Sequence, residues 1–136
     1  MIIADTSGLL ALFNEREPRH QDVRRVVAEE PAPLVVSPYV VAELDYLVGA
    51  RIGLAAELGV LRELGSPGYL LADMPDSSLL GAVDMVERYG DQRIGITDAS
   101  LVLLTQRHRT TRVLTLDRRH FTVLRTKEGR GFTLLP

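Results

Sequence analysis

Several acidic residues of this sequence occupy positions at which carboxylates can meet and do chemistry. Asp5 follows the apolar segment MIIA, and Asp117 follows the apolar segment VLTL. Asp98 lies in GITDASLVLL, near the start of a predicted helix. Because the carboxyl ends of parallel strands open at the same edge of a sheet, Asp5 and Asp117 are expected to approach each other there.

Each of these acids also has a plainer explanation. An aspartate at the start of a helix caps free backbone N–H groups and interacts favourably with the helix dipole. This explanation applies to Asp5, ahead of a helix predicted from Ser7, and to Asp98. Asp73 also follows an apolar stretch. Because Met74-Pro75 after it indicates a turn rather than the start of a helix, we rank Asp73 below Asp5 and Asp117 as a candidate site residue.

The helix predicted after Ser37-Pro38 carries two further acids. Its apolar stripe contains Val40, Val41, Leu44, Leu47 and Val48, and Glu43 and Asp45 fall on opposite flanks of that stripe. Helical periodicity does not choose between these two acids, since either is compatible with a solvated helix edge.

Carboxylates that are brought together repel one another unless a cation lies among them. The sequence has no cysteine, and its histidines, His20, His108 and His120, are scattered. Oxygen ligands without thiolates or clustered imidazoles favour the hard ions Mg²⁺ or Mn²⁺ over zinc. Such an ion lowers the pKa of a water that attacks phosphorus and stabilises the leaving oxygen. The acids therefore indicate phosphodiester hydrolysis.

Basic charge is concentrated in the C-terminal part of the chain. The net charge is −2, but residues 1–85 hold 13 acids and 6 bases, whereas residues 86–136 hold 5 acids and 10 bases. All bases except Lys127 are arginines, which suit bidentate contacts to phosphate. A genome that uses Arg in place of Lys explains much of the excess but not its clustering, which favours an anionic polymer as partner.

Strand-length apolar segments alternate with helix-period segments along the chain, which we assign to one domain, 1–136. Strands are predicted at 1–4, 34–36, 69–74, 112–117 and 132–135, and helices at 7–15, 19–30, 38 to 49 or 53, 54–64, 77–90 and 96–109. The expected fold is α/β with three layers, a mainly parallel sheet of four to five strands between helices. Without a secretory signal or a membrane-length apolar run, the protein is expected to be cytoplasmic, with no membrane contact.

Four segments occur in an order that resembles a known family: IIADTSGLLALF, VVSPYVVAELDYL, GITDASLVLL and VLTLDRRHF. Together they resemble the PIN domain, and specifically the VapC-type ribonuclease toxins of bacterial toxin–antitoxin pairs. The resemblance extends over nearly the whole chain, although residues 54–92 carry no motif that we can assign. It selects Glu43 over Asp45 and implies an acidic tetrad of Asp5, Glu43, Asp98 and Asp117.

In such proteins the tetrad binds one or two Mg²⁺ or Mn²⁺ ions, and RNA is cleaved endonucleolytically. The resemblance implies Asp5 and Asp98 as direct ligands, with Glu43 and Asp117 completing the metal environment partly through water.

Polar neighbours of the tetrad have expected roles as well. Thr6 and Thr97 are expected to orient a carboxylate or a water, which is compatible with helix capping. Arg118, Arg119 and His120 directly follow the last acid, and we expect at least one of them near substrate phosphate. For the arginines, an ion pair with that acid or simple exposure is an equally good explanation.

The same resemblance implies partners. VapC-type toxins form homodimers and are inhibited by a VapB antitoxin, whose C-terminal segment lies over the active-site groove. The antitoxin's N-terminal part binds operator DNA in a higher complex. Toxins of this kind cut particular tRNAs or loops of ribosomal RNA.

Other functions remain open at this point. An aspartyl phosphatase needs a second acid where Ser7 stands, and a receiver domain needs a lysine closer to Asp117 than Lys127 is. A catalytically silent RNA-binding or scaffold PIN domain is an alternative that loss of a tetrad acid would indicate, and all four acids are present. A metal-dependent DNA nuclease is a further alternative, because contacts to the 2′-hydroxyl are not visible in a sequence.

Overall fold

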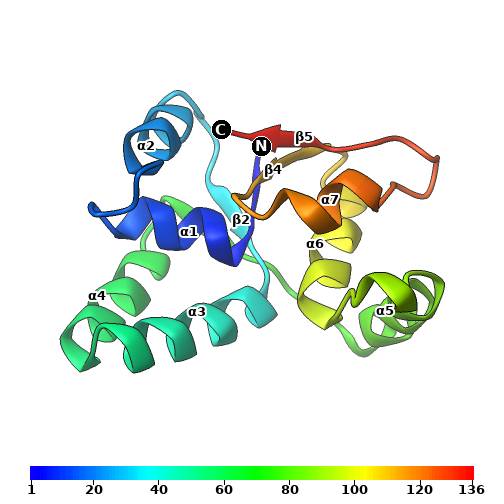
Figure 1. Ribbon diagram of the computed structural model, residues 1–136, viewed down its shortest axis with the longest axis horizontal. Helices are drawn as coiled ribbons and strands as arrows, with labels where there is room; N and C mark the ends of the chain where they lie inside the picture. The colour runs from blue at the N-terminus through cyan, green and yellow to red at the C-terminus, as the bar shows by residue number, and fades with distance from the viewer.

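A five-stranded sheet forms the centre of the protein in the computed structural model, which describes residues 1–136 (Figure 1). Every strand pairing is parallel, and the strand order is β3-β2-β1-β4-β5. The strands are β1 (Ile3–Ala4), β2 (Leu34–Val36), β3 (Tyr69–Leu71), β4 (Arg112–Leu114) and β5 (Thr133–Leu135). Because all strands run in one direction, their carboxyl ends open at a single edge.

Helices cover both faces of this sheet, so the predicted three-layer α/β architecture is confirmed (Figure 1). In Figure 1, α1 to α4 lie on one side of the strands, and α5 and α6 lie on the other. The helices are α1 (Thr6–Phe13), α2 (His20–Ala28), α3 (Pro38–Arg51), α4 (Leu54–Leu64), α5 (Asp76–Arg88), the 3₁₀ helix η1 (Gly90–Gln92), α6 (Ile96–Arg107) and α7 (Arg118–Val123). None of them is both long enough and apolar enough to span a membrane.

The two central strands are apolar on both faces, as expected for a parallel sheet with helices on each side. Ile3 and Ala4 of β1 and Val35 and Val36 of β2 have no exposed surface. Together with residues from the helices they form one continuous hydrophobic core. The core thus holds the central strands in place, and the residues that follow each strand start from a fixed position at the carboxyl edge of the sheet.

Gly8 allows α1 to pack tightly against the end of β4. A Cβ atom at this position would lie 2.5 Å from the carbonyl oxygen of Leu114, closer than any side chain can approach. The same close approach brings the segment 5–7 next to the chain that leaves β4. Sequence positions more than a hundred residues apart therefore share one corner of the sheet.

A pair of buried serines joins α3 to α6. The hydroxyl of Ser37 accepts a hydrogen bond from the backbone N–H of Tyr39 at 3.2 Å, and Pro38 occupies the first turn, as the sequence predicts. The Ser37 hydroxyl also lies 2.7 Å from that of Ser100 in α6, and neither side chain is exposed. This contact connects the helix that carries Glu43 to the helix that carries Asp98.

The structure corrects the ends of two predicted strands. β3 ends at Leu71 rather than at residue 74, and β4 ends at Leu114 rather than at residue 117. The sequence prediction also missed α7, which begins directly after Asp117. The carboxylate of Asp117 accepts the backbone N–H of Arg119 at 3.2 Å and so begins a helix where an extended strand was expected.

Candidate active site

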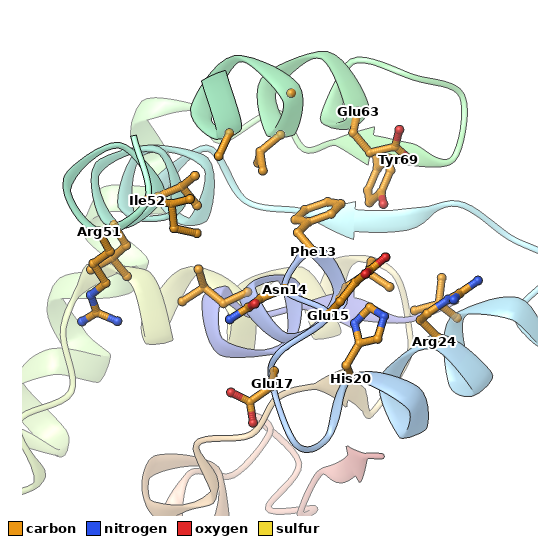
Figure 2. Close-up of a pocket in the computed structure, with 18 residues that line it drawn as sticks. Phe13, Asn14, Glu15, Glu17, His20, Arg24, Arg51, Ile52, Glu63 and Tyr69 are labelled. Atoms are coloured by element: carbon orange, nitrogen blue, oxygen red, sulfur yellow. The ribbon is translucent and has the colours of Figure 1, made fainter. Parts of the chain in front are cut away.

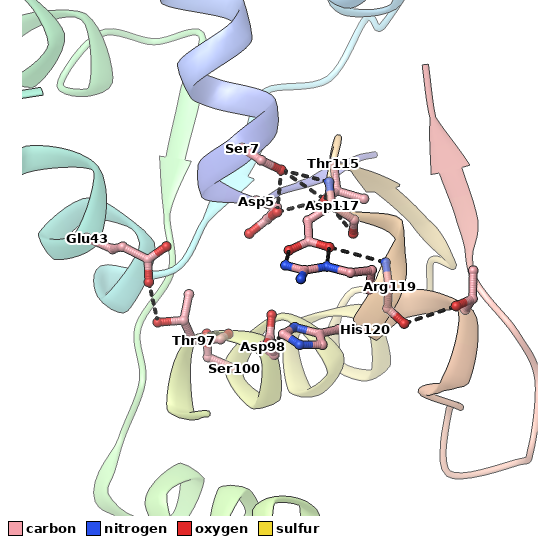
Figure 3. A network of polar contacts seen from close by, with 11 residues as sticks. Asp5, Ser7, Glu43, Thr97, Asp98, Ser100, Thr115, Asp117, Arg119 and His120 are labelled. Atoms are coloured by element: carbon pink, nitrogen blue, oxygen red, sulfur yellow. Dashed lines mark hydrogen bonds and ion pairs between the residues drawn. The ribbon is translucent and has the colours of Figure 1, made fainter. Parts of the chain in front are cut away.

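Asp5 lies at the carboxyl end of β1 and is almost completely buried, with 7% of its surface exposed. Its side chain does not cap α1. Instead, its Oδ2 atom accepts hydrogen bonds from the hydroxyls of Ser7 and Thr115, each at 2.7 Å. The capping explanation for Asp5 is therefore wrong, and its carboxylate is held by side chains from two distant parts of the chain (Figure 3).

The hydroxyls of Ser7 and Thr115 are themselves tied to the backbone after β4. Ser7 Oγ accepts the N–H groups of Leu116 at 2.9 Å and of Asp117 at 3.3 Å. Thr115 Oγ1 also accepts the N–H of Asp117, at 3.1 Å. The position of the Asp5 carboxylate is thus coupled to the backbone that carries Asp117.

Asp117 forms a two-pronged ion pair with Arg119. Arg119 Nε lies 3.2 Å from Asp117 Oδ1, and its Nη2 lies 3.0 Å from Oδ2. The hydrogen bonds from this guanidinium hold the pKa of the Asp117 carboxyl below its usual range. Because the Arg119 side chain is 83% exposed, the pair can open at little cost.

Asp98 is placed by the first turn of α6 and is paired with His120 of α7. Nδ1 of His120 lies 2.9 Å from Asp98 Oδ2. Burial raises the pKa of Asp98 to about 6; the nearby carboxylates of Asp5 and Asp117 add to this increase, and His120 opposes it. The three aspartates are therefore close enough to affect one another electrostatically, as Figure 3 also shows.

Glu43 approaches the same corner from α3. Its Oε2 accepts a hydrogen bond from Thr97 Oγ1 at 3.3 Å, one residue before Asp98 (Figure 3). Asp45 instead lies beside Glu57 of α4, and this neighbouring carboxyl raises the pKa of Glu57. The structure therefore places Glu43, and not Asp45, on the side of the aspartates.

The chemistry of these side chains fits a hard divalent cation. The donors are carboxylate and hydroxyl oxygens, and a cation relieves both the burial of the Asp98 charge and the repulsion from Asp5 and Asp117, which together raise the pKa of Asp98. Thr6 Oγ1, next to Asp5, is buried without any hydrogen-bond partner. No three Asp, Glu or His side chains are placed to ligate one ion together. In this arrangement at most two acids would contact the ion directly, and the others would act through water.

The residues singled out in the sequence lie at different distances from this corner. It brings the three aspartates together and leaves Glu43 at the rim, bonded to Thr97. Arg118 is directed elsewhere, since its Nη2 donates to the carbonyl of Pro136 at 2.8 Å. Sequence reasoning missed Ser7 and Thr115 as partners of Asp5; the only signal is their spacing, two residues after Asp5 and two before Asp117.

A groove of about 850 Å³ lies between α1, α3 and α4 (Figure 2). Its lining is mostly apolar and includes Leu10, Phe13 and Val60, with Glu17 and Glu63 among its charged residues. A shallower hollow beside it is lined by Leu10 and Glu17 as well as by Asp117 and Arg119. Because the two depressions share residues, the apolar groove leads toward the acids.

Comparisons with known proteins agree on one family. A family model described as the PIN domain matches residues 2–126. Ribonuclease VapC26 of Mycobacterium tuberculosis (strain ATCC 25618 / H37Rv) is 51% identical over 135 residues, which is 99% of this chain and 100% of that protein.

A solved structure shares the fold. The crystal structure of Mycobacterium tuberculosis VapC20, described as a sarcin-ricin loop cleaving toxin, superposes with a TM-score of 0.79 at 21% identity. The match covers 86% of this chain and 90% of that chain.

Proposed function

This chain belongs to the PIN-domain family and to its VapC ribonucleases, and from that premise we propose that it is a metal-dependent endoribonuclease toxin. The observation that carries this proposal is the convergence of Asp5, Asp98 and Asp117 at the carboxyl edge of a parallel sheet. Mutually repelling carboxylates at such an edge suit a cation that meets a phosphodiester.

The acids would divide the work of holding Mg²⁺, or Mn²⁺ in its place. Asp5 and Asp98 would be direct ligands, and Glu43 and Asp117 would act through water. A bound divalent ion supplies charge neutralisation at the scissile phosphate and a lowered pKa for the attacking water. Thr97 would keep the Glu43 carboxylate in place through the hydrogen bond described above.

Arg119 would serve as an internal counterion until the metal and RNA arrive. Its guanidinium forms a fork on Asp117, but its long side chain is exposed and can turn toward a phosphate. Arg118, at the same end of α7, is the other candidate for a phosphate contact. Both arginines line the hollow beside Asp117, and Arg118 would have to leave the Pro136 carbonyl to reach a phosphate.

The substrate would be structured RNA, either tRNA or ribosomal RNA. The relative of 51% identity is named a ribonuclease, and the toxin that shares the fold is described as cleaving the sarcin-ricin loop. An RNA stem-loop of that type is therefore a defined first substrate. Acting on such RNA, the protein would work in the cytoplasm.

A VapB-type antitoxin would inhibit the enzyme by binding along the apolar groove. The groove is lined mostly by apolar side chains, with both acidic residues and arginines among the rest, which suits an amphipathic segment that carries charges of both signs. Since the groove leads to the hollow beside Asp117, a bound segment could extend over the acids. We further propose a homodimer, a higher complex with the antitoxin, and contact to operator DNA only through the antitoxin.

The decisive experiment is a digest of total RNA with mapped ends, using antitoxin-free protein. The wild type should cut at discrete sites with Mg²⁺ or Mn²⁺ and not with EDTA, and Asp98→Asn should not cut. Equal cleavage by both proteins would exclude the proposed mechanism. Cleavage of single-stranded DNA but not RNA would indicate a DNA nuclease, and RNA binding without cleavage would indicate a silent scaffold.

A further inference from the structure

We propose that Ser7 and Thr115 are positioning residues that orient the Asp5 carboxylate for metal binding and couple it to Asp117. This inference rests on the proposed function, because it concerns the site at which the cation would be held. Neither hydroxyl needs to touch the metal or the substrate. Their role would be to hold one carboxylate oxygen of Asp5 so that the other is available to bind the cation.

The hydrogen-bond inventory of Ser7 determines the direction of its hydroxyl proton. A serine hydroxyl has one donor and two acceptor lone pairs. Both acceptor positions of Ser7 Oγ are used by backbone N–H groups, from Leu116 and Asp117. Its single proton is therefore directed to Asp5 Oδ2, at 2.7 Å, which is closer than the other hydroxyl neighbour, Thr115 Oγ1, at 3.1 Å.

Thr115 adds a second hydrogen bond to the same oxygen. Its Oγ1 accepts the N–H of Asp117 at 3.1 Å and donates to Asp5 Oδ2 at 2.7 Å. Thr115 is fully buried, so water does not compete for this hydroxyl. No hydrogen bond reaches Asp5 Oδ1, which remains free for a cation while Oδ2 is held twice.

The same hydroxyls connect two acids that come from opposite ends of the sequence. Asp5 is carried by the end of β1, and Asp117 by the loop after β4. With Ser7 bonded to both the carboxylate of Asp5 and the amide of Asp117, a shift of one acid is transmitted to the other. Hydrogen bonds that orient metal-binding carboxylates typically change metal affinity by about 10- to 100-fold.

The test uses the isosteric variant Thr115→Val, which removes the hydroxyl, and Thr115→Ser, which keeps the hydroxyl and removes the methyl group, together with Ser7→Ala. Mn²⁺ binding to each purified, full-length protein is measured by electron paramagnetic resonance of the free ion. Ser7→Ala and Thr115→Val should each weaken Mn²⁺ binding by about tenfold or more, whereas Thr115→Ser, which keeps the hydroxyl, should stay close to wild type.

A second measurement, amide exchange in the metal-free protein, tests the hydrogen bonds themselves. The amide of Leu116 should exchange faster in Ser7→Ala than in wild type, because it loses its acceptor, whereas the amide of Asp117 keeps Thr115 Oγ1. The matched control is Thr105→Val, which removes a buried hydroxyl that bonds only the Val102 carbonyl, at 2.7 Å. This variant should lower the melting temperature without changing Mn²⁺ affinity.

The possible failures are distinguishable. If wild type binds Mn²⁺ and both Ser7→Ala and Thr115→Val bind it equally well, the positioning role is overturned while the proposed function stands. The role is also overturned if Thr115→Ser binds Mn²⁺ as weakly as Thr115→Val, or if amide exchange at Leu116 does not change in Ser7→Ala. If wild type binds no Mn²⁺, the proposed metal site itself is overturned.

Discussion

Nδ1 of His120 lies 2.9 Å from the carboxylate of Asp98, so two residues of different helices form a contact at the centre of the acidic corner. A similar arrangement joins Arg119 to Asp117. Side chains from a single turn of α7 thus contact two of the acids. The third acid, Asp5, has only hydroxyl partners. A divalent cation would neutralise the negative charge that these contacts leave on the acids.

The raised pKa of Asp98 predicts how stability depends on pH in metal-free protein. A carboxyl with a higher pKa in the folded than in the unfolded state stabilises the fold at low pH and loses that contribution as pH rises through the folded pKa. Between about pH 4 and pH 6, where Asp98 has its raised pKa of about 6, this loss is up to roughly 3 kcal/mol. Urea unfolding of wild type and Asp98→Asn in EDTA measures it.

Asp98→Asn should remove this part of the pH dependence, because asparagine does not titrate. Parallel stability curves for the two proteins between pH 4 and pH 6 would contradict the prediction.

The raised pKa of Asp98 also predicts that Mn²⁺ binding by wild type strengthens as pH rises through about 6, because the cation competes with the proton on Asp98.

Asp5→Asn should abolish RNA cleavage and leave the fold intact. Asparagine keeps an oxygen that can accept hydrogen bonds from Ser7 and Thr115, so their contacts survive, but it removes the charge that would hold the metal. With repulsion among the acids reduced, the melting temperature of metal-free protein should stay equal or rise. Residual Mg²⁺-dependent cleavage near the wild-type rate would exclude Asp5 as a ligand.

Glu43 and Asp45 provide a comparison within one helix. Glu43→Gln should lower the cleavage rate by at least about tenfold, since outer ligands of a metal site commonly have effects of this size. Asp45→Asn should leave the rate unchanged, because Asp45 contacts Glu57 on α4 rather than the acidic corner. Rates are measured on the same RNA stem-loop at saturating Mg²⁺. A larger loss in Asp45→Asn than in Glu43→Gln would reverse the assignment.

Arg119→Ala should strengthen Mn²⁺ binding several-fold. The guanidinium that holds down the pKa of Asp117 also competes with a metal for that carboxylate, and its removal frees Oδ2 and leaves only the backbone N–H of residue 119 on Oδ1. The control is Arg118→Ala, whose guanidinium contacts the Pro136 carbonyl instead. Titration with Mn²⁺ in the absence of RNA compares the variants. Weaker binding by Arg119→Ala would mean that Arg119 maintains the shape of the site.

Gly8→Ala should destabilise the protein by at least about 2 kcal/mol, because its Cβ would overlap the backbone oxygen of Leu114. Gly59→Ala is the matched control in α4: nothing lies within 4 Å of the new Cβ, and alanine should stabilise the helix by up to about 1 kcal/mol. Urea unfolding gives both values. If Gly8→Ala is as stable as wild type, α1 does not pack on β4 as described.

The layers of the fold and the general position of the acids could be predicted from local patterns. Alternating apolar strands and amphipathic helices indicated a parallel sheet, and an aspartate after each of two apolar segments indicated its carboxyl edge. The exact end of β4 could not be predicted. Thr115 and Leu116 look like strand residues, but hydroxyl and capping contacts turn the chain toward α7.

By itself, the sequence determined the fold class and indicated the candidate aspartates, because hydrophobic periodicity is a local property, whereas Glu43 was selected only by the resemblance to a known family. Only the tertiary structure decided how each acid is held: Asp5 by Ser7 and Thr115, Asp98 by His120, and Asp117 by Arg119. The Asp5–Thr115 contact spans 110 positions. Such a contact forms only when the strands are aligned and α1 approaches β4 at Gly8, and no local pattern records that approach.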